Sequence, residues 1–238
     1  MSTLNFKSLN KVFLLSILIF GLLSCSESAT SKEKNYPPEG FIQIQKLIPD
    51  IIIEARYFGN HNFIGKQIDG YQSDSLILSL PAAKALRKVQ KKLKPSGYEL
   101  KIFDAYRPQK AVDHFVKWAK DLKDTLNKKE FYPSIPKSEL FKEGYIAAKS
   151  GHSRGSTIDL TLIYSQSKEE LDMGSTYDFF GPISWPSDSS LSPLQYNNRM
   201  LLQKTMEENG FVHLPQEWWH FTLKNEPYPD QYFDFDIE

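Results

Sequence analysis

The sequence is almost without cysteine, because Cys25 is the only one among 238 residues. A single thiol excludes a disulfide within the chain, and it also excludes a zinc site built from several thiolates. Any metal site in this protein must therefore use nitrogen and oxygen ligands.

The sequence also lacks an excess of charge of either sign. It has 29 Lys and Arg against 29 Asp and Glu, and removal of residues 1–24 would take away only two lysines. Nucleic-acid binding depends on a basic surface, so this balance gives no electrostatic reason to expect nucleic acid as a partner. No feature indicates an obligate protein partner.

Residues 1–24 have the pattern of a signal peptide. Lys7 and Lys11 precede a mainly apolar run, 12–23, which is shorter than the about 20 residues that span a bilayer. Leu22-Leu23-Ser24-Cys25 resembles a bacterial lipobox, in which the cysteine is lipidated and becomes the new N-terminus. The alternative is a plain signal peptide with Cys25 near the cut by chance. We expect an exported lipoprotein, anchored to a membrane through Cys25 and facing the periplasm or the cell exterior.

The remaining chain divides into a tether and one domain. Residues 25–38 begin with Cys25 and are polar up to Pro37-Pro38, which is typical of a flexible linker. Residues 39–238 show no internal repeat and no second linker, and their length suits a single domain.

Helical and strand patterns are mixed along this domain without regular βαβ alternation, which predicts an α+β fold. Apolar residues recur at helical spacing after Pro81, Pro108 and Ser192-Pro193. The lysine-rich residues 123–149 predict a mobile excursion. Helices are expected at 81–93, 108–122 and 192–209, and strands at 51–57, 100–104, 156–163, 211–214 and 218–223.

His152 and Asp159 are candidate metal ligands. His152 lies in a small, polar stretch, and Asp159 follows between Ile158 and Leu160. A carboxylate in an apolar strand is unfavourable unless it is paired or bound to a cation. Zinc binds neutral imidazole and carboxylate in a tetrahedral site and would remove that cost. The alternative is that Asp159 pairs with Arg154 or caps a turn.

The segment 217–220 (EWWH) adds a glutamate and a histidine. Positions i and i+3 of a regular strand face opposite sides, so Glu217 and His220 serve one site only if the backbone turns between them. We therefore expect Glu217 in the turn after Pro215 and His220 on the strand, with the two tryptophans shielding the site. The alternative is an aromatic core strand with a surface glutamate.

Arg107 follows a predicted strand and precedes a predicted helix, a place where functional side chains are common. An arginine there could stabilise an oxyanion or bind a carboxylate. The alternative is a structural salt bridge with Asp104 or Asp113.

Together these segments resemble a known family. Residues 150–161 (SGHSRGSTIDLT), 217–220 (EWWH) and 104–108 (DAYRP) are similar to motifs of the D-alanyl-D-alanine dipeptidases of the VanX type. These are zinc peptidases that share a fold with the hedgehog signalling domain. The resemblance implies a hedgehog/DD-peptidase-like fold for residues 39–238, with a small, mainly antiparallel sheet and flanking helices. It extends to residues 53–57, 62–65 and 171–180.

The resemblance also implies a role for each matching residue. It implies one zinc ion per chain, held by His152, Asp159 and His220 with the fourth position left for water. It further implies that Glu217 is the general acid/base and that Arg107 stabilises the tetrahedral intermediate.

Other matching residues concern the substrate. Asp178 and Ser150 match groups that meet its free ammonium, and Tyr57 matches an aromatic residue lining the site. Gly151 departs from the pattern, because a second serine is expected there, and this puts the substrate contact in doubt. The signal sequence is another departure, because the best-known members work in the cytoplasm. Three histidines match no ligand and are expected to be structural or at the surface: His61, His114 and His213.

The implied function is zinc-dependent hydrolysis of D-alanyl-D-alanine, or a closely related D-dipeptide, in cell-wall peptide metabolism. Two further functions fit parts of the pattern. A D,D- or L,D-carboxypeptidase would trim peptidoglycan stem peptides with the same metal chemistry, and the Asp178 segment argues against it. A non-catalytic cell-wall-binding module is the second, and intact Glu217 and Arg107 argue against it.

Overall fold

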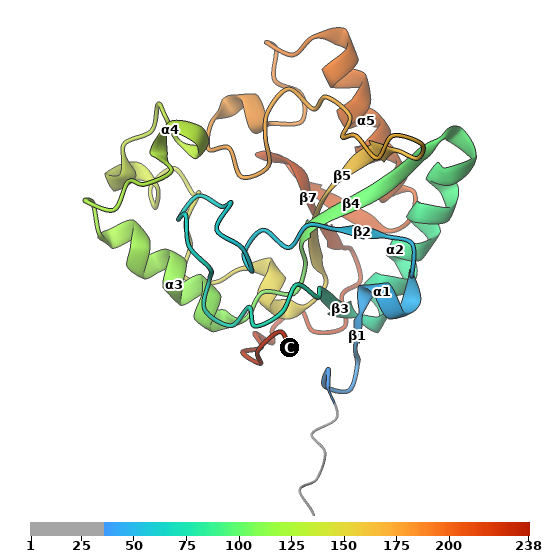
Figure 1. Ribbon diagram of the computed structural model, residues 1–238, viewed down its shortest axis with the longest axis horizontal. Helices are drawn as coiled ribbons and strands as arrows, with labels where there is room; N and C mark the ends of the chain where they lie inside the picture. Colours follow the sequence, from blue (N-terminus) through green and yellow to red (C-terminus); the bar gives the residue numbers. More distant parts are fainter. Residues whose placement is uncertain (1–35) are drawn as a thin grey trace, which may run out of the picture. The chain divides into compact units, whose positions relative to one another are not determined.

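Five strands form the central sheet of the structure, a computed structural model that describes residues 36–238 (Figure 1). Their order is β2–β4–β5–β7–β6, and only the β2–β4 pair is parallel. A separate antiparallel pair is formed by β1 and β3. The predicted mainly antiparallel sheet is confirmed. The strands are β1 (Phe41–Gln43), β2 (Ile52–Ile53), β3 (Ile77–Ser79), β4 (Tyr98–Asp104), β5 (Thr157–Tyr164), β6 (Phe211–Leu214) and β7 (Glu217–Leu223).

The two longest helices begin with side-chain caps that the sequence encodes. The side chain of Ser79 accepts a hydrogen bond from the backbone N–H of Ala82, and Ser192 forms a capping box with Gln195. The α+β prediction is confirmed, and the three long helices lie within a few residues of the predicted ranges. The helices are α1 (Ile44–Leu47), α2 (Leu80–Leu93), α3 (Gln109–Lys120), α4 (Lys128–Phe131) and α5 (Pro193–Glu207).

Alternation along β5 separates the hydrophobic core from the site. Ile158, Leu160 and Leu162 belong to the core cluster that includes residues of α2 and α5, two helices on the same side of the sheet (Figure 1). Successive side chains of a strand point to opposite faces. Asp159 and Thr161 therefore face away from that cluster.

A bulge in β4 aligns polar residues across three neighbouring strands. Ile102 pairs with Leu160, but Asp104 pairs with Asp159, so Phe103 is an extra residue in the ladder. On its other edge β5 pairs Asp159 with a histidine of β7, His220. Asp104, Asp159 and His220 thus form one row across the sheet.

The prediction of a mobile excursion at 123–149 is wrong, because this segment packs into a second hydrophobic cluster. Phe131, Tyr132 and Leu140 are fully buried. The ring of Tyr132 meets that of Trp118 on α3 edge-on, with centroids 5.6 Å apart. The segment therefore belongs to the folded body and carries part of the cavity wall described below.

The predicted strand at 51–57 is shorter than expected. Only Ile52–Ile53 is regular β2, although the backbone N–H groups of Glu54 and Arg56 still donate to carbonyls of β4. This irregular end brings the buried Tyr57 toward the site.

The expected signal peptide (1–24), Cys25 and the tether up to residue 35 lie outside the described residues. Within residues 36–238, no helix has the length and apolar character needed to cross a bilayer.

Candidate active site

One cavity of about 340 Å³ brings together all the predicted site residues that the structure describes. Its wall draws on distant parts of the sequence, from β5, β7 and the loops after β2 and β4. A volume of this size suits a small ligand. The predicted residues in the wall are Tyr57, Arg107, Ser150, His152, Asp159, Asp178, Glu217 and His220.

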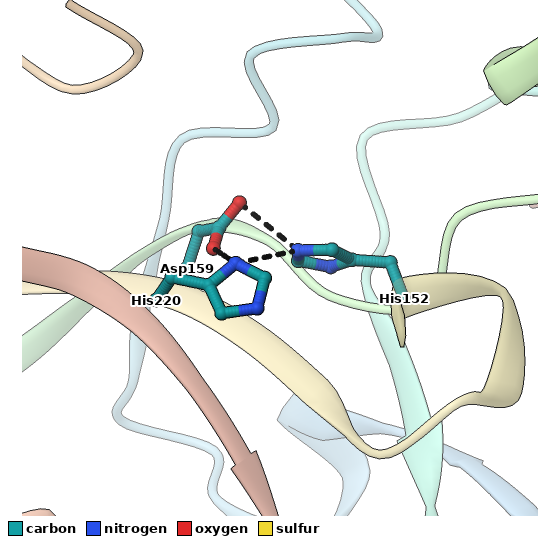
Figure 2. Close-up of side chains that lie close together, drawn as sticks. All are labelled: His152, Asp159 and His220. Carbon is teal, nitrogen blue, oxygen red and sulfur yellow. Dashed lines mark hydrogen bonds and ion pairs between the residues drawn. The ribbon is translucent and has the colours of Figure 1, made fainter. Parts of the chain in front are cut away.

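The side chains of His152, Asp159 and His220 point toward one another (Figure 2), and all three line the cavity. Nε2 of His152 lies 3.3 Å from Oδ2 of Asp159 and 3.4 Å from Nδ1 of His220. Nδ1 of His220 lies 3.1 Å from Oδ1 of Asp159. Within residues 36–238, this is the one group of three such side chains close enough to hold a metal ion.

Backbone contacts set the orientation of His152. It lies in the short 3₁₀ helix Gly151–Arg154, just before β5, and is almost fully buried. Its Nδ1 is 2.6 Å from the carbonyl oxygen of Ala105, an acceptor only, so Nδ1 carries the proton. The lone pair of Nε2 is then free to face the centre, as in histidine ligands fixed by a second hydrogen bond.

Asp159 gives the clearest sign that a cation belongs here. The residue is buried, and its Oδ1 lies 3.1 Å from Nδ1 of His220 but accepts no hydrogen bond from residues 36–238. Burial raises the pKa of the Asp159 carboxyl, but the neighbouring His152 and His220 lower it more, so the group stays ionised. A buried ionised carboxylate with an oxygen that accepts no hydrogen bond is costly without a cation. Two imidazoles and one carboxylate are a ligand set that suits zinc.

Glu217 and His220 reach the same site as predicted, because the β6–β7 ladder is irregular between them. Leu214 pairs with Glu217, but His213 pairs with Phe221, so the strand bulges. Oε2 of Glu217 lies 3.3 Å from Nδ1 of His220. Glu217 is the first residue of β7 rather than a turn residue.

The charge around His220 is negative. Burial lowers the pKa of His220, but the carboxylates of Asp159 and Glu217 outweigh burial and raise it to about 9. This position therefore favours a positive charge, which a metal ion would supply in place of the proton.

Arg107 forms one of the two predicted salt bridges, with Asp104, and also lines the cavity. Its Nε and Nη2 donate to Oδ2 of Asp104, at 2.9 and 2.7 Å, which is the structural salt bridge. Its guanidinium also lies over the rings of Tyr57 and Phe115 and lines the cavity. Nη1 has no hydrogen-bond partner among the described residues, which leaves it available to a substrate.

Asp104 is the buried carboxylate behind this arginine. Its Oδ1 accepts a hydrogen bond of 2.6 Å from the hydroxyl of Tyr71, and its Oδ2 lies 3.5 Å from Nδ1 of His152. Asp104 therefore binds Arg107 and at the same time lies close to His152, a candidate metal ligand.

Asp178 and Tyr57 form what we term the Asp178 end of the cavity. The Tyr57 hydroxyl donates to Oδ2 of Asp178 at 2.7 Å. Burial, and then the charge of Asp159, raise the pKa of the Asp178 carboxyl well above its ordinary value. Asp178 also has a φ of 60°, a conformation that residues with side chains rarely adopt. Such strained residues concentrate at functional sites.

Ser150 and Gly151 form the entry to the 3₁₀ helix of His152. The Ser150 side chain accepts a hydrogen bond of 3.3 Å from the backbone N–H of His152. A Cβ atom at Gly151 would lie 2.8 Å from Oγ1 of Thr157, which itself bonds to Thr222. A serine at Gly151 would therefore require Thr157 to move.

Arg154 and the histidines outside the cluster have partners away from the site. Arg154 pairs with Glu226 at 2.8 Å, so it is not the partner of Asp159. The three histidines that match no ligand lie outside the cavity wall and pair with carboxylates: His61 with Glu130, His114 with Asp69, and His213 with Glu207.

Sequence reasoning missed two parts of the site. One is the part of the cavity wall formed by residues 144–147 and Lys149, which lie in a lysine-rich stretch without periodicity. The other is Tyr177, whose hydroxyl donates to Oδ2 of Asp159 at 3.0 Å. Its position directly before Asp178 was the available signal. Burial raises the pKa values of Tyr57 and Tyr177 well above the ordinary value, so both hydroxyls keep their protons.

Comparison with known families matches residues 38–238 to Peptidase_M15, described as D-Ala-D-Ala dipeptidase. The chain is 41% identical over 198 residues to the D-alanyl-D-alanine dipeptidase of Enterococcus faecalis, covering 83% of this chain and 98% of that protein. It is 40% identical over 197 residues to that of Streptomyces coelicolor, covering 83% and 98%. It is 33% identical over 182 residues to that of Escherichia coli, covering 76% and 83%.

These matches extend over nearly the whole described structure, and they include the segments that hold the cavity. They confirm the family resemblance, and with the three-residue cluster they confirm the predicted zinc cofactor. The roles of the individual residues stay predictions. The chain belongs to the D-Ala-D-Ala dipeptidase family, Peptidase_M15.

Proposed function

We propose that this protein hydrolyses D-alanyl-D-alanine, or a closely related D-dipeptide, in a zinc-dependent reaction. The observation that carries the proposal is the convergence of a three-ligand cluster, Glu217, Arg107 and buried Asp178 on one small cavity. The E. faecalis, S. coelicolor and E. coli relatives are named as dipeptidases of this substrate, which supports the same assignment.

His152, Asp159 and His220 would hold the zinc ion. Three protein ligands are typical of catalytic rather than structural zinc, because one position stays open. Bound zinc supplies Lewis-acid chemistry, which polarises a carbonyl and makes water more acidic.

Glu217 is the proposed general base and acid. It lies beside His220 and lines the cavity, with its side chain one quarter exposed, so that solvent water can reach it. It would take a proton from the attacking water and then give that proton to the amine that leaves when the peptide bond breaks. Positioned proton transfer of this kind contributes roughly 10²- to 10⁴-fold in rate.

Arg107 is the proposed donor to the oxyanion that develops on the peptide carbonyl. Asp104 binds Nε and Nη2 and fixes the guanidinium plane, while Nη1 remains for the substrate. A donor fixed before the reaction stabilises the transition state without reorganising.

Asp178 is the proposed partner of the substrate's ammonium. Burial raises the pKa of its carboxyl, so a negative charge there is unfavourable without a nearby cation, which supports this role. The ammonium of a free dipeptide would be that cation, whereas the amide of a longer stem peptide would not. We propose that Asp178, with Tyr57 holding one of its oxygens, selects substrates with a free N-terminus close to the scissile bond. Ser150, which also lines the cavity, would meet the same ammonium.

A substrate panel tests this proposal against a carboxypeptidase function. Purified protein with zinc is offered D-Ala-D-Ala, L-Ala-L-Ala and a pentapeptide stem, and amino-acid release is measured. We expect release from D-Ala-D-Ala well above that from the other two. Comparable release from the pentapeptide would replace the dipeptidase assignment with that of a carboxypeptidase.

We also propose that residues 1–24 direct export and that Cys25 carries the lipid, with 25–38 as the tether to the catalytic domain, 39–238. The support is the lipobox-like Leu22-Leu23-Ser24-Cys25 after an apolar run. Cys25→Ala should abolish incorporation of labelled lipid, because the thiol is the acylation point. Unchanged labelling would contradict the anchor.

A further inference from the structure

Tyr177 lies between the metal cluster and the Asp178 end of the cavity. Its hydroxyl oxygen is 3.0 Å from Oδ2 of Asp159 and 3.3 Å from the hydroxyl oxygen of Tyr57. Tyr177 is 2% exposed as a residue and is absent from the cavity wall. Tyr177 thus contacts a candidate ligand from outside the cavity wall.

Packing fixes the Tyr177 ring independently of that hydrogen bond. The ring stacks on Phe103 with centroids 4.7 Å apart and an interplanar angle of 21°. Trp219 meets it edge-on with centroids 5.5 Å apart. Phe103 is the bulge residue of β4, and Trp219 precedes His220 on β7. The Tyr177 ring is therefore packed between residues of the two strands on either side of β5, which holds Asp159.

The hydroxyl makes the two oxygens of Asp159 different. Oδ2 accepts a hydrogen bond from Tyr177 and lies 3.3 Å from Nε2 of His152 and 3.6 Å from Nη2 of Arg107. Oδ1 lies 3.1 Å from Nδ1 of His220 and accepts no hydrogen bond among the described residues. A hydrogen bond to one oxygen limits rotation of the carboxylate. The lone pairs of the other oxygen then remain available to a metal ion. Partners of this kind orient metal ligands and affect metal affinity.

We propose that Tyr177 is a positioning residue, whose hydroxyl holds Oδ2 of Asp159 so that the carboxylate presents Oδ1 to the zinc ion. This inference rests on the proposed function in one respect, that zinc is bound by Asp159 together with His152 and His220.

The Tyr177 hydroxyl also contacts the Asp178 end of the cavity, through the hydroxyl of Tyr57. Tyr57 has one hydroxyl proton, which it donates to Asp178, so its oxygen can only accept from Tyr177. Tyr177 also has one proton and two acceptors, the ionised Asp159 and the neutral Tyr57. A hydrogen bond to an ionised acceptor is the stronger one, so the proton of Tyr177 belongs mainly to Asp159. The Tyr177 hydroxyl therefore contacts both ends of the site.

Tyr177→Phe tests the proposal because it removes the hydroxyl and keeps the stacked ring. Zinc affinity is measured by competition with a chelator of known affinity, which does not depend on activity. We expect zinc to bind about 10- to 100-fold more weakly than in the unchanged protein. With saturating zinc, KM for the dipeptide should change less than the zinc affinity, because Tyr177 does not line the cavity.

Tyr106→Phe is the matched control. Tyr106 is also buried, but its hydroxyl donates to the carbonyl of Phe235 in the C-terminal segment, at 2.9 Å, rather than to a site residue. Its zinc affinity should equal that of the unchanged protein. Thermal unfolding of all three proteins in excess chelator checks that each one folds.

Unchanged zinc affinity in Tyr177→Phe would overturn the positioning role. An equal loss in Tyr106→Phe would overturn it as well, because any buried hydroxyl would then have the same effect. Failure of the unchanged protein to bind zinc would instead contradict the proposed function.

Discussion

The metal cluster and the Asp178 end of the cavity are built in different ways. Asp159 and His220 are direct partners on neighbouring strands, and His152 lies in the 3₁₀ helix that enters β5. Asp178 lies outside the regular elements, with a φ of 60°, and Tyr57 follows the irregular end of β2.

This difference indicates a division of labour. Residues on paired strands hold their geometry with little freedom, which suits a metal that requires fixed ligand positions. Residues on loops change more readily between relatives, which suits the choice of substrate. We therefore expect changes in the cluster to abolish zinc binding, and changes at the Asp178 end to alter which peptides are cleaved while zinc stays bound.

The largest effect is expected from the ligands themselves. His152→Ala, Asp159→Ala or His220→Ala should each remove the roughly one zinc ion per chain, and with it the activity, because two remaining ligands do not hold the ion tightly. Metal analysis of the purified proteins measures this. His213→Ala is the matched control, since His213 pairs with Glu207 away from the cavity. Full zinc content in all three ligand variants would refute the cluster.

Glu217→Gln separates zinc binding from catalysis, because Glu217 contacts His220 but is not a proposed ligand. Zinc should stay bound, while kcat falls by roughly 10²- to 10⁴-fold if the carboxylate transfers the proton. Steady-state kinetics and metal analysis of the same preparation separate the two effects. Loss of zinc in this variant would make Glu217 part of the metal site.

Arg107→Ala should lower kcat by roughly 10²- to 10³-fold with zinc retained, as expected for the loss of an oxyanion donor. It should also destabilise the protein, because buried Asp104 then loses its cation. Arg107→Lys keeps a cation near Asp104 and should recover stability more than kcat. Denaturant unfolding and kcat, measured on both variants, decide this. Equal recovery of both would reduce Arg107 to a structural role.

The sequence predicts the regular parts of this structure well, for identifiable reasons. Proline and serine mark the starts of α2 and α5, and apolar residues follow at helical spacing. Asp159 attracts attention because it interrupts an apolar strand, which is unfavourable without a partner. The motifs around His152, Glu217 and Arg107 then carry the resemblance to the family.

The remaining features depend on contacts between segments far apart in the sequence. Phe131, Tyr132 and Leu140 are scattered among lysines, so nothing local shows that they are buried. The bulge at Phe103 that aligns Asp104 with Asp159 is a property of the paired strands. The contact of Tyr177 with Asp159 depends on how its loop packs beside β5, so the sequence around Tyr177 does not show it.

The most direct test of the whole account compares D-Ala-D-Ala with its N-acetylated form. A buried charge left unpaired costs several kcal/mol, and about 1.4 kcal/mol corresponds to a factor of ten in rate. Acetylation should therefore lower kcat/KM by at least about 10²-fold in the unchanged protein. Asp178→Asn should narrow that gap, mainly by slowing the free dipeptide, at unchanged zinc content. Equal kcat/KM for the two substrates in the unchanged protein would contradict the dipeptidase assignment and show a site open on the N-terminal side.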